Sequence, residues 1–175
     1  QASHDNLTGL VNRREFERRA ERLIDTVKHY KTEHAMCFMD LDQFKVVNDT
    51  CGHVAGDELL RQLTTVLKGV VRKRDTLARL GGDEFAILME HCSLDDARRV
   101  AESIHKTVQD YQFVWGDHTF KVGASIGLVA ITEMVTNITE LMREADAACY
   151  TAKDLGRNRI HVYDHDDEDL ARRSG

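Results

Sequence analysis

The sequence has no proline, and no low-complexity stretch interrupts it, so nothing indicates separate domains joined by an internal linker. No apolar run approaches the roughly 20 residues that a membrane-spanning helix needs. The four cysteines show neither C-x-x-C spacing nor neighbouring paired histidines, which argues against a zinc site or a disulfide framework. We therefore expect one compact unit with reduced thiols, as is typical of the cytoplasm.

Positive charge is also scarce, with 24 Lys and Arg against 30 Asp and Glu and a formal net charge of −6. Because proteins that bind a nucleic-acid backbone usually present a basic face, we do not expect nucleic acid as a partner. A nucleotide substrate is still compatible with this charge, since bound divalent cations can supply positive charge locally.

The ends of the chain suggest a piece of a longer protein. It starts at Gln1 rather than Met and ends in ARRSG. We expect a folded domain over residues 1–165 and a polar linker or tail over 166–175 that leads toward a further domain. Sensors, a membrane anchor or other catalytic domains would then lie outside this sequence.

Apolar periodicity and two capping signals, Ser93 with Asp96 and Asn137 with Glu140, predict an α+β fold. Helices are expected over 13–31, 59–70, 93–108 and 137–156, and strands over 35–39, 76–80, 85–90, 120–128 and 159–163. The GGDE sequence between the second and third strands is typical of a hairpin turn. This order predicts an antiparallel-containing central sheet with helices on one face.

Acidic residues lie at two strand ends. Asp40 and Asp42 follow the first apolar strand, and we expect only one of them to face the hairpin; Asp40, directly after the apolar run, is the better metal candidate. If the hairpin pairs beside this strand, Asp83 lies next to Asp40. Two carboxylates repel each other unless a cation lies between them, and two hard oxygen ligands with room for phosphate suit Mg²⁺.

Each polar position also has a purely structural interpretation. DLDQF is compatible with a helix N-cap, and GG with a tight turn that leaves Asp83 unexplained. Asn48 suits a turn and Asp57 an N-cap. Lys153 and Arg157 are compatible with a solvated basic helix end, and both side chains would lie on one face if the helix continues to Gly156. Arg72 and Asp75 are compatible with a charged turn.

Five blocks together resemble the GGDEF family of diguanylate cyclases. They are DNLTGLVNRREF (5–16), FMDLDQFKVVNDTCGHVAGDELL (38–60), RKRD (72–75), GGDEF (81–85) and YTAKDLGRNRI (150–160). The blocks occur in the family's order over nearly the whole chain, and they also resemble the GGDEF halves of proteins in which an EAL phosphodiesterase domain follows. The resemblance implies a fold like that of nucleotide cyclases and polymerase palms, with the GGDEF motif on a β-hairpin.

The resemblance also implies roles for individual residues. Metal ligands for Mg²⁺, with Mn²⁺ as an alternative, would be Asp40, Asp83 and the backbone carbonyl of Leu41. Substrate contacts would come from Phe44, Lys45, Asn48, Asp57, Gly81, Gly82, Lys153 and Arg157. Among these, Asn48 and Asp57 would read the guanine edge, and the basic residues would hold the triphosphate. Catalytic roles would fall to Asp83 as proton acceptor, Lys45 as a stabiliser of developing charge, and Glu84 beside the metal.

The activity implied is condensation of two GTP into cyclic di-GMP and two pyrophosphates across an antiparallel homodimer. Arg72 and Asp75 match the family's RxxD product-inhibition site. Two alternatives stay open: a non-catalytic module that senses GTP or cyclic di-GMP and controls an attached domain, and a polymerase palm or purine-nucleotide cyclase. A polymerase palm or a purine-nucleotide cyclase would also use two carboxylates, but neither accounts for the GGDEF and RxxD motifs.

Overall fold

The structure is a computed structural model that describes residues 2–174. Its helices are α1 (Arg13–Tyr30), α2 (Phe44–Cys51), α3 (His53–Lys68), α4 (Leu94–Asp110), α5 (Ile138–Asp154) and α6 (Asp166–Ser174). Its strands are β1 (His34–Asp42), β2 (Thr76–Gly81), β3 (Glu84–Met89), β4 (Gln112–Trp115), β5 (His118–Lys121), β6 (Gly123–Ile131) and β7 (Ile160–Val162). Within residues 2–174, no helix is both long and apolar enough to cross a membrane.

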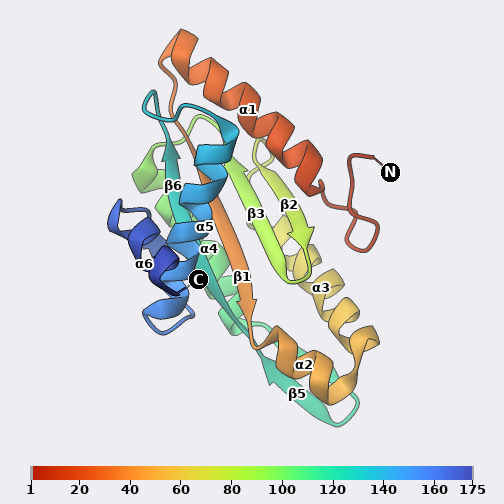
Figure 1. The fold of residues 1–175 in the computed structure, drawn as a ribbon. Helices are drawn as coiled ribbons and strands as arrows, with labels where there is room; N and C mark the ends of the chain where they lie inside the picture. The colour runs from red at the N-terminus through yellow and green to blue at the C-terminus, as the bar shows by residue number, and fades with distance from the viewer. Residues whose placement is uncertain (1, 175) are drawn as a thin grey trace.

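A five-stranded sheet in the order β2-β3-β1-β6-β7 forms the centre of the molecule (Figure 1). β3 is antiparallel to both β2 and β1, β6 is antiparallel to β1, and β7 is parallel to β6. The predicted α+β fold with an antiparallel-containing sheet is therefore confirmed. Because β1 and β2 run in the same direction, the end of β1 and the β2–β3 turn lie at the same end of the sheet.

Helices cover both faces of this sheet, so the prediction of helices on one face was wrong. Alternate residues of β1 enter two different cores: Cys37 packs with α3 and α4, whereas Met36 packs with α1 and α5. Both side chains are fully buried. A strand buried on both faces has a continuous apolar sequence, which carries no sign of how many faces are covered.

The predicted helix caps are present. Ser93 Oγ accepts a hydrogen bond from the Asp96 amide at 3.1 Å, and Asn137 Oδ1 accepts one from the Glu140 amide at 2.8 Å. The strand predicted over 120–128 is in fact two strands, because β5 turns back onto β4 in a separate hairpin while β6 joins the main sheet. The polar segment after β1 forms the additional helix α2.

The described part of the predicted tail, residues 166–174, is a helix that packs on α5 (Figure 1). Asp167 in this helix is buried and accepts hydrogen bonds from Thr151 Oγ1 at 2.9 Å and from the Asp164 amide at 2.7 Å. This part of the chain is thus not frayed. That it leads to a further domain stays a prediction, and Gly175 lies outside the described residues.

Candidate active site

The structure brings Asp40, Asp83 and Glu84 to one end of the sheet. In the pairing of β1 with β3, Asp40 lies opposite Glu84. The backbone amide of Leu41 donates to the carbonyl of Asp83 at 3.2 Å, which fixes the GGDEF turn against the end of β1. Strand pairing alone therefore brings Asp40 to Asp83 and Glu84, which lie more than 40 positions later in the sequence.

The proximity of these carboxylates affects the pKa values of Asp83 and Glu84. Burial raises the pKa of Asp83 above its ordinary value, and the negative charge of Asp40 raises it further. The same two causes, in the same order, raise the pKa of Glu84. Partial burial and mutual repulsion both disfavour the ionised forms of Asp83 and Glu84. A bound cation would offset both effects, so this end of the sheet favours a cation.

Lys153, near the end of α5, supplies one positive charge to the cluster. Its ammonium forms an ion pair with Asp40. Although burial disfavours the charged amine, the hydrogen bond and the charge of Asp40 raise the pKa of Lys153. The interpretation of Lys153 as a solvated helix end was therefore wrong, because its ammonium lies at the acidic cluster.

The residues at this end fit a divalent cation. In the part of the chain that the structure describes, no group of three or more His, Cys, Asp or Glu side chains could hold a metal ion by itself. The predicted donor set does not need one, since it consists of the Asp40 and Asp83 carboxylates with the Leu41 carbonyl. Mg²⁺ commonly takes only one or two protein carboxylates and completes its shell with phosphate and water.

Asp42, the second acid of the Asp-x-Asp pair, has a different environment. It is 8% exposed and accepts hydrogen bonds from Ser125 Oγ at 2.8 Å and from the Asn158 amide at 2.9 Å. The interpretation of DLDQF as a helix N-cap is confirmed in position, because the N-cap of α2 is Gln43 within this segment. Neither aspartate caps the helix, however, and Gln43 has a left-handed conformation with φ 71° and forms no side-chain cap bond.

The residues predicted to read guanine lie on α2 and α3. Asn48 Oδ1 is buried and has no hydrogen-bond partner among the described residues. It lies over Gly56, where an added Cβ would be 1.9 Å from Asn48 Oδ1 and 3.3 Å from the Phe44 ring. Asn48 is inside α2 and Asp57 is inside α3, whose N-cap is Gly52, so the turn and N-cap interpretations of these two residues were wrong.

The other predicted triphosphate ligands, Lys45 and Arg157, form no ion pair with the acidic cluster among the described residues. Lys45 is 87% exposed at its side chain and pairs with Asp49 at 2.7 Å. Arg157 follows the end of α5 at Asp154 and has a left-handed backbone with φ 62°. The condition for Lys153 and Arg157 to share one helix face, a helix that continues to Gly156, is not met, because α5 ends at Asp154 between them.

Arg79 stabilises the GGDEF turn through a hydrogen bond to its backbone, a role that the sequence analysis did not predict. Its guanidinium donates to the carbonyl of Gly82 at 2.8 and 3.0 Å and to Asp5 Oδ1 at 3.0 Å. Gly81 and Gly82 both have positive φ, at 148° and 47°. The pairing joins parts of the chain 74 residues apart, so local sequence gave no signal for it.

Arg72 and Asp75 form a two-pronged ion pair in the turn before β2. Both hydrogen bonds between the guanidinium and the carboxylate are 2.8 Å long, and the side chain of Asp75 is fully buried. Arg72 also donates to the carbonyl of Glu90 at 3.0 Å. A hollow of about 310 Å³ adjoins this pair, with Arg19 and Lys68 on its wall.

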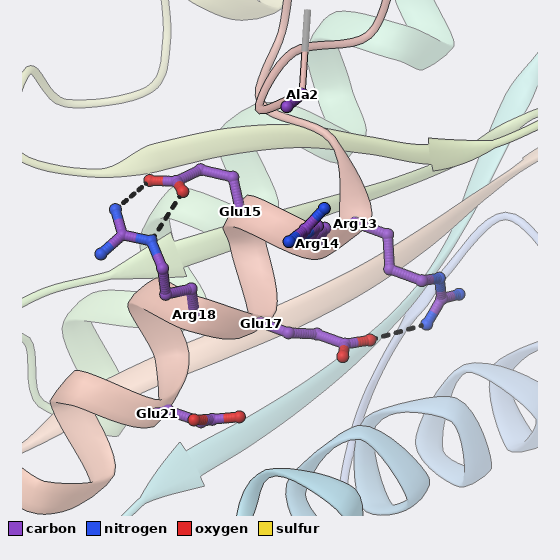
Figure 2. Close-up of a pocket in the computed structure, with 7 residues that line it drawn as sticks. All are labelled: Ala2, Arg13, Arg14, Glu15, Glu17, Arg18 and Glu21. Atoms are coloured by element: carbon purple, nitrogen blue, oxygen red, sulfur yellow. Dashed lines mark hydrogen bonds and ion pairs between the residues drawn. The ribbon is translucent and has the colours of Figure 1, made fainter.

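A second hollow, of about 570 Å³, lies along the first turns of α1 (Figure 2). It is lined mostly by charged side chains that pair with one another: Arg13 with Glu17 at 3.3 Å, and Arg18 with Glu15 at 2.6 Å. Because four of its six charged side chains are already paired on an exposed helix surface, the acidic cluster at the sheet end is the better candidate for chemistry.

Solved structures with the same fold define the class of this domain. The GGDEF domain of TpbB (YfiN) from Pseudomonas aeruginosa superposes with a TM-score of 0.89 at 34% identity, covering 97% of this chain and 99% of that one. The GGDEF domain of DgcB from Caulobacter crescentus, in complex with c-di-GMP, has a TM-score of 0.87 at 28% identity, covering 93% and 96% of the two chains.

Residues 2–159 match the family model described as "Diguanylate cyclase, GGDEF domain", and the chain belongs to this family. A relative, the probable diguanylate cyclase DgcE of Escherichia coli, is 46% identical over 163 residues. That alignment covers 93% of this chain but 15% of DgcE, so the chain corresponds to one part of a much longer relative. The family's enzymes are nucleotidyltransferases.

Proposed function

We propose that this domain condenses two molecules of GTP into cyclic di-GMP, releasing two pyrophosphates, with one GTP bound by each domain of an antiparallel homodimer. The observation that supports this most directly is the convergence of Asp40, Asp83 and Glu84 at the GGDEF turn, with the pKa values of Asp83 and Glu84 raised. Clustered carboxylates at a sheet end gain stability from a bound cation and its phosphate ligands.

In the proposed reaction, the 3′-oxygen of one GTP forms a bond to the α-phosphorus of the other, and the bond from that phosphorus to the bridging oxygen of pyrophosphate breaks. A second identical step closes the ring. Asp83 is the candidate acceptor for the proton of the 3′-hydroxyl. Mg²⁺ bound by Asp40, Asp83 and the Leu41 carbonyl would neutralise phosphate charge. Because each site holds only one reactant, two domains must face each other.

Guanine recognition is assigned to Asn48 and Asp57. A buried amide oxygen without a partner is costly, and a nucleobase donor would remove that cost. The Asp57 carboxylate accepts from the N1–H and N2–H₂ donors of guanine, and adenine would present an acceptor there instead. Lys45, Lys153 and Arg157 are proposed to hold the triphosphate, with Phe44, Gly81 and Gly82 shaping the pocket and Glu84 beside the cation.

The test is incubation of the concentrated domain with GTP and Mg²⁺, followed by chromatography of the products. We expect cyclic di-GMP and pyrophosphate, and a loss of at least about 100-fold in the Asp83→Ala variant. Asp95→Ala, an exposed acid on α4, is the matched control and should retain activity. If enforced dimerisation through a fused coiled coil yields no cyclic di-GMP, the catalytic proposal fails. GTP or cyclic di-GMP binding without turnover would then favour the regulatory module.

We further propose that Arg72 and Asp75 bind the product and inhibit the enzyme. A guanidinium can contact a phosphate or the guanine Hoogsteen edge in a bidentate manner, and the adjoining hollow has basic side chains on its wall. Added cyclic di-GMP should slow the wild type and the control variant Arg74→Ala, whose exposed side chain is not among the described residues that line the hollow, but not Arg72→Ala. Melting curves establish that the Arg72 variant is folded, and feedback that persists in it would refute the assignment.

A further inference from the structure

Asp42 and the turn over residues 156–158 have no explanation in the proposed metal and guanine sites, yet they contact each other. We propose that Asp42 is a positioning residue whose buried carboxylate holds this turn in a strained conformation, so that the Arg157 guanidinium is presented to the triphosphate. The inference rests on the proposed function, in which Arg157 is a triphosphate ligand.

The turn has an unfavourable backbone. Gly156, Arg157 and Asn158 have φ values of 120°, 62° and 49°, three consecutive residues in a region that favours glycine. Residues with a Cβ adopt it only where the surroundings hold them there, and such positions concentrate at ligand-binding sites. In this turn, two of the three residues are not glycine.

The end of α5 holds the first part of this turn, since the Gly156 and Arg157 amides donate to the carbonyls of Lys153 and Ala152 at 3.2 and 3.0 Å, and Asp42 supports its last residue, Asn158. Asp42 Oδ2 accepts from the Asn158 amide at 2.9 Å, and Asp42 Oδ1 accepts from Ser125 Oγ at 2.8 Å. The Asn158 amide also lies 3.3 Å from Ser125 Oγ. Ser125 is fully buried, and Asp42 is the last residue of β1, so the support is rigid. Hydrogen bonds to an ionised carboxylate are stronger than those to a neutral acceptor.

Further contacts fix Asn158 and leave its neighbour exposed. Asn158 Nδ2 donates to Gln109 Oε1 at 3.0 Å, and the Asn158 carbonyl lies 2.9 Å from His105 Nε2. A Cβ at Gly123 would be 2.7 Å from Asn158 Oδ1, so the asparagine rests directly on β6. The Arg157 side chain is exposed and, within residues 2–174, forms no hydrogen bond or ion pair. The scaffold therefore fixes the backbone of Arg157 and leaves its guanidinium available.

The location of this support matches the proposed role. Asp42 lies two residues after Asp40 on β1, and Lys153, which pairs with Asp40, precedes Arg157 by four residues. The turn thus begins beside the acidic cluster. A guanidinium at this point can form two parallel hydrogen bonds to phosphate oxygens, provided that its backbone is held in place.

The test is a double-mutant cycle on nucleotide affinity. Binding of a non-hydrolysable GTP analogue with Mg²⁺ is measured by calorimetry for the wild type, Asp42→Asn, Arg157→Ala and the double variant. We expect Asp42→Asn to weaken binding about tenfold in the wild-type background and less than about twofold when Arg157 is already absent. GMP, which lacks the β- and γ-phosphates, should bind Asp42→Asn and the wild type equally. Asp110→Asn, an exposed acid on α4, is the control.

An unchanged affinity in Asp42→Asn, or an equal loss in both backgrounds, would overturn the inference. If Asp42→Asn does not fold, Ser125→Ala, which removes one of the two partners of the carboxylate, takes its place in the cycle. A second readout separates this inference from the proposed function: hydrogen exchange of the Asn158 amide should be slow in the wild type and at least about tenfold faster in Asp42→Asn. Should the wild type bind no GTP analogue, the proposed function fails, whereas unchanged exchange at Asn158 refutes the support itself.

Discussion

At the scale of single residues, Gly56 shows how the absence of a side chain can shape a pocket. It lies in the first turns of α3 and has ordinary helical geometry, so its backbone does not require glycine. Replacing a helical glycine by alanine normally stabilises a protein by about 1 kcal/mol. Here the new methyl group would lie 1.9 Å from Asn48 Oδ1, so the amide would have to move.

Gly56→Ala should therefore lower the affinity for GTP more than it lowers the stability of the domain. We expect KM for GTP to rise about tenfold or more, with a smaller effect on kcat, since the Asn48 amide would leave the position in which it is proposed to read guanine. Steady-state kinetics with GTP measures both constants. Gly69→Ala is the matched control, because its Cβ would meet only the Val66 carbonyl at 3.3 Å. An unchanged KM in Gly56→Ala would contradict the position assigned to Asn48.

At the scale of whole elements, α6 is attached to the domain by a buried polar network rather than by apolar packing alone. Besides its bonds to Thr151 and Asp164, the Asp167 carboxylate lies 2.9 Å from His161 Nε2, which joins α6 to β7. Glu168 adds an ion pair with Arg143 at 2.8 Å. Removing a buried acceptor leaves its donors unsatisfied, and each such group costs about 1–3 kcal/mol.

Asp167→Ala should release α6 from α5. We expect a loss of about 2 kcal/mol in the free energy of unfolding, or local opening of α6 with an unchanged melting temperature for the rest of the domain. Urea titration and hydrogen exchange of α6 amides distinguish these forms. Asp169→Ala on the same helix removes only an exposed pair with Arg172 and serves as the control. Protected α6 amides and unchanged stability in Asp167→Ala would contradict this attachment.

At the scale of the whole molecule, a net charge of −6 combines with an acidic cluster in which the pKa values of Asp83 and Glu84 are raised. A carboxyl group with a higher pKa in the folded state than in the unfolded state binds more protons when folded. Stability from Asp83 is then fully present below its unfolded value of 3.8 and declines as pH rises through the folded pKa. We therefore expect ionised Asp83 and Glu84 to destabilise the metal-free domain at neutral pH.

Asp83→Asn should accordingly raise the melting temperature of the domain by a few degrees at pH 7 in chelator, because it removes one of the repelling charges. The gain should shrink as the pH falls toward 4. Added Mg²⁺ should raise the melting temperature of the wild type more than that of the variant, since a bound ion stabilises only the form that holds it. Asp95→Asn is the control. A variant that is less stable than the wild type in chelator would refute this electrostatic account.

Much of the fold was predictable from local sequence, because the features concerned depend on neighbouring residues. The Ser93 and Asn137 caps, the amphipathic helix α1 and the GGDE hairpin all follow from spacing within a few positions. The division of 120–128 into two strands and the burial of both sheet faces depend on distant partners, so periodicity did not reveal them.

The sequence by itself determined the family, through motifs that span almost the whole chain, and it identified Asp40 and Asp83 as neighbours. Only the tertiary structure decided what each acid contacts. Asp42 and Asp40 are both acids at the end of the same strand, and local sequence does not distinguish them. The hydrogen-bond partners of Asp42, Ser125 and Asn158, lie 83 and 116 residues further along the chain. Local patterns specify which side chains are polar, whereas the pairing of β1 with β6 and the turn after α5 determine which polar groups meet in the folded state.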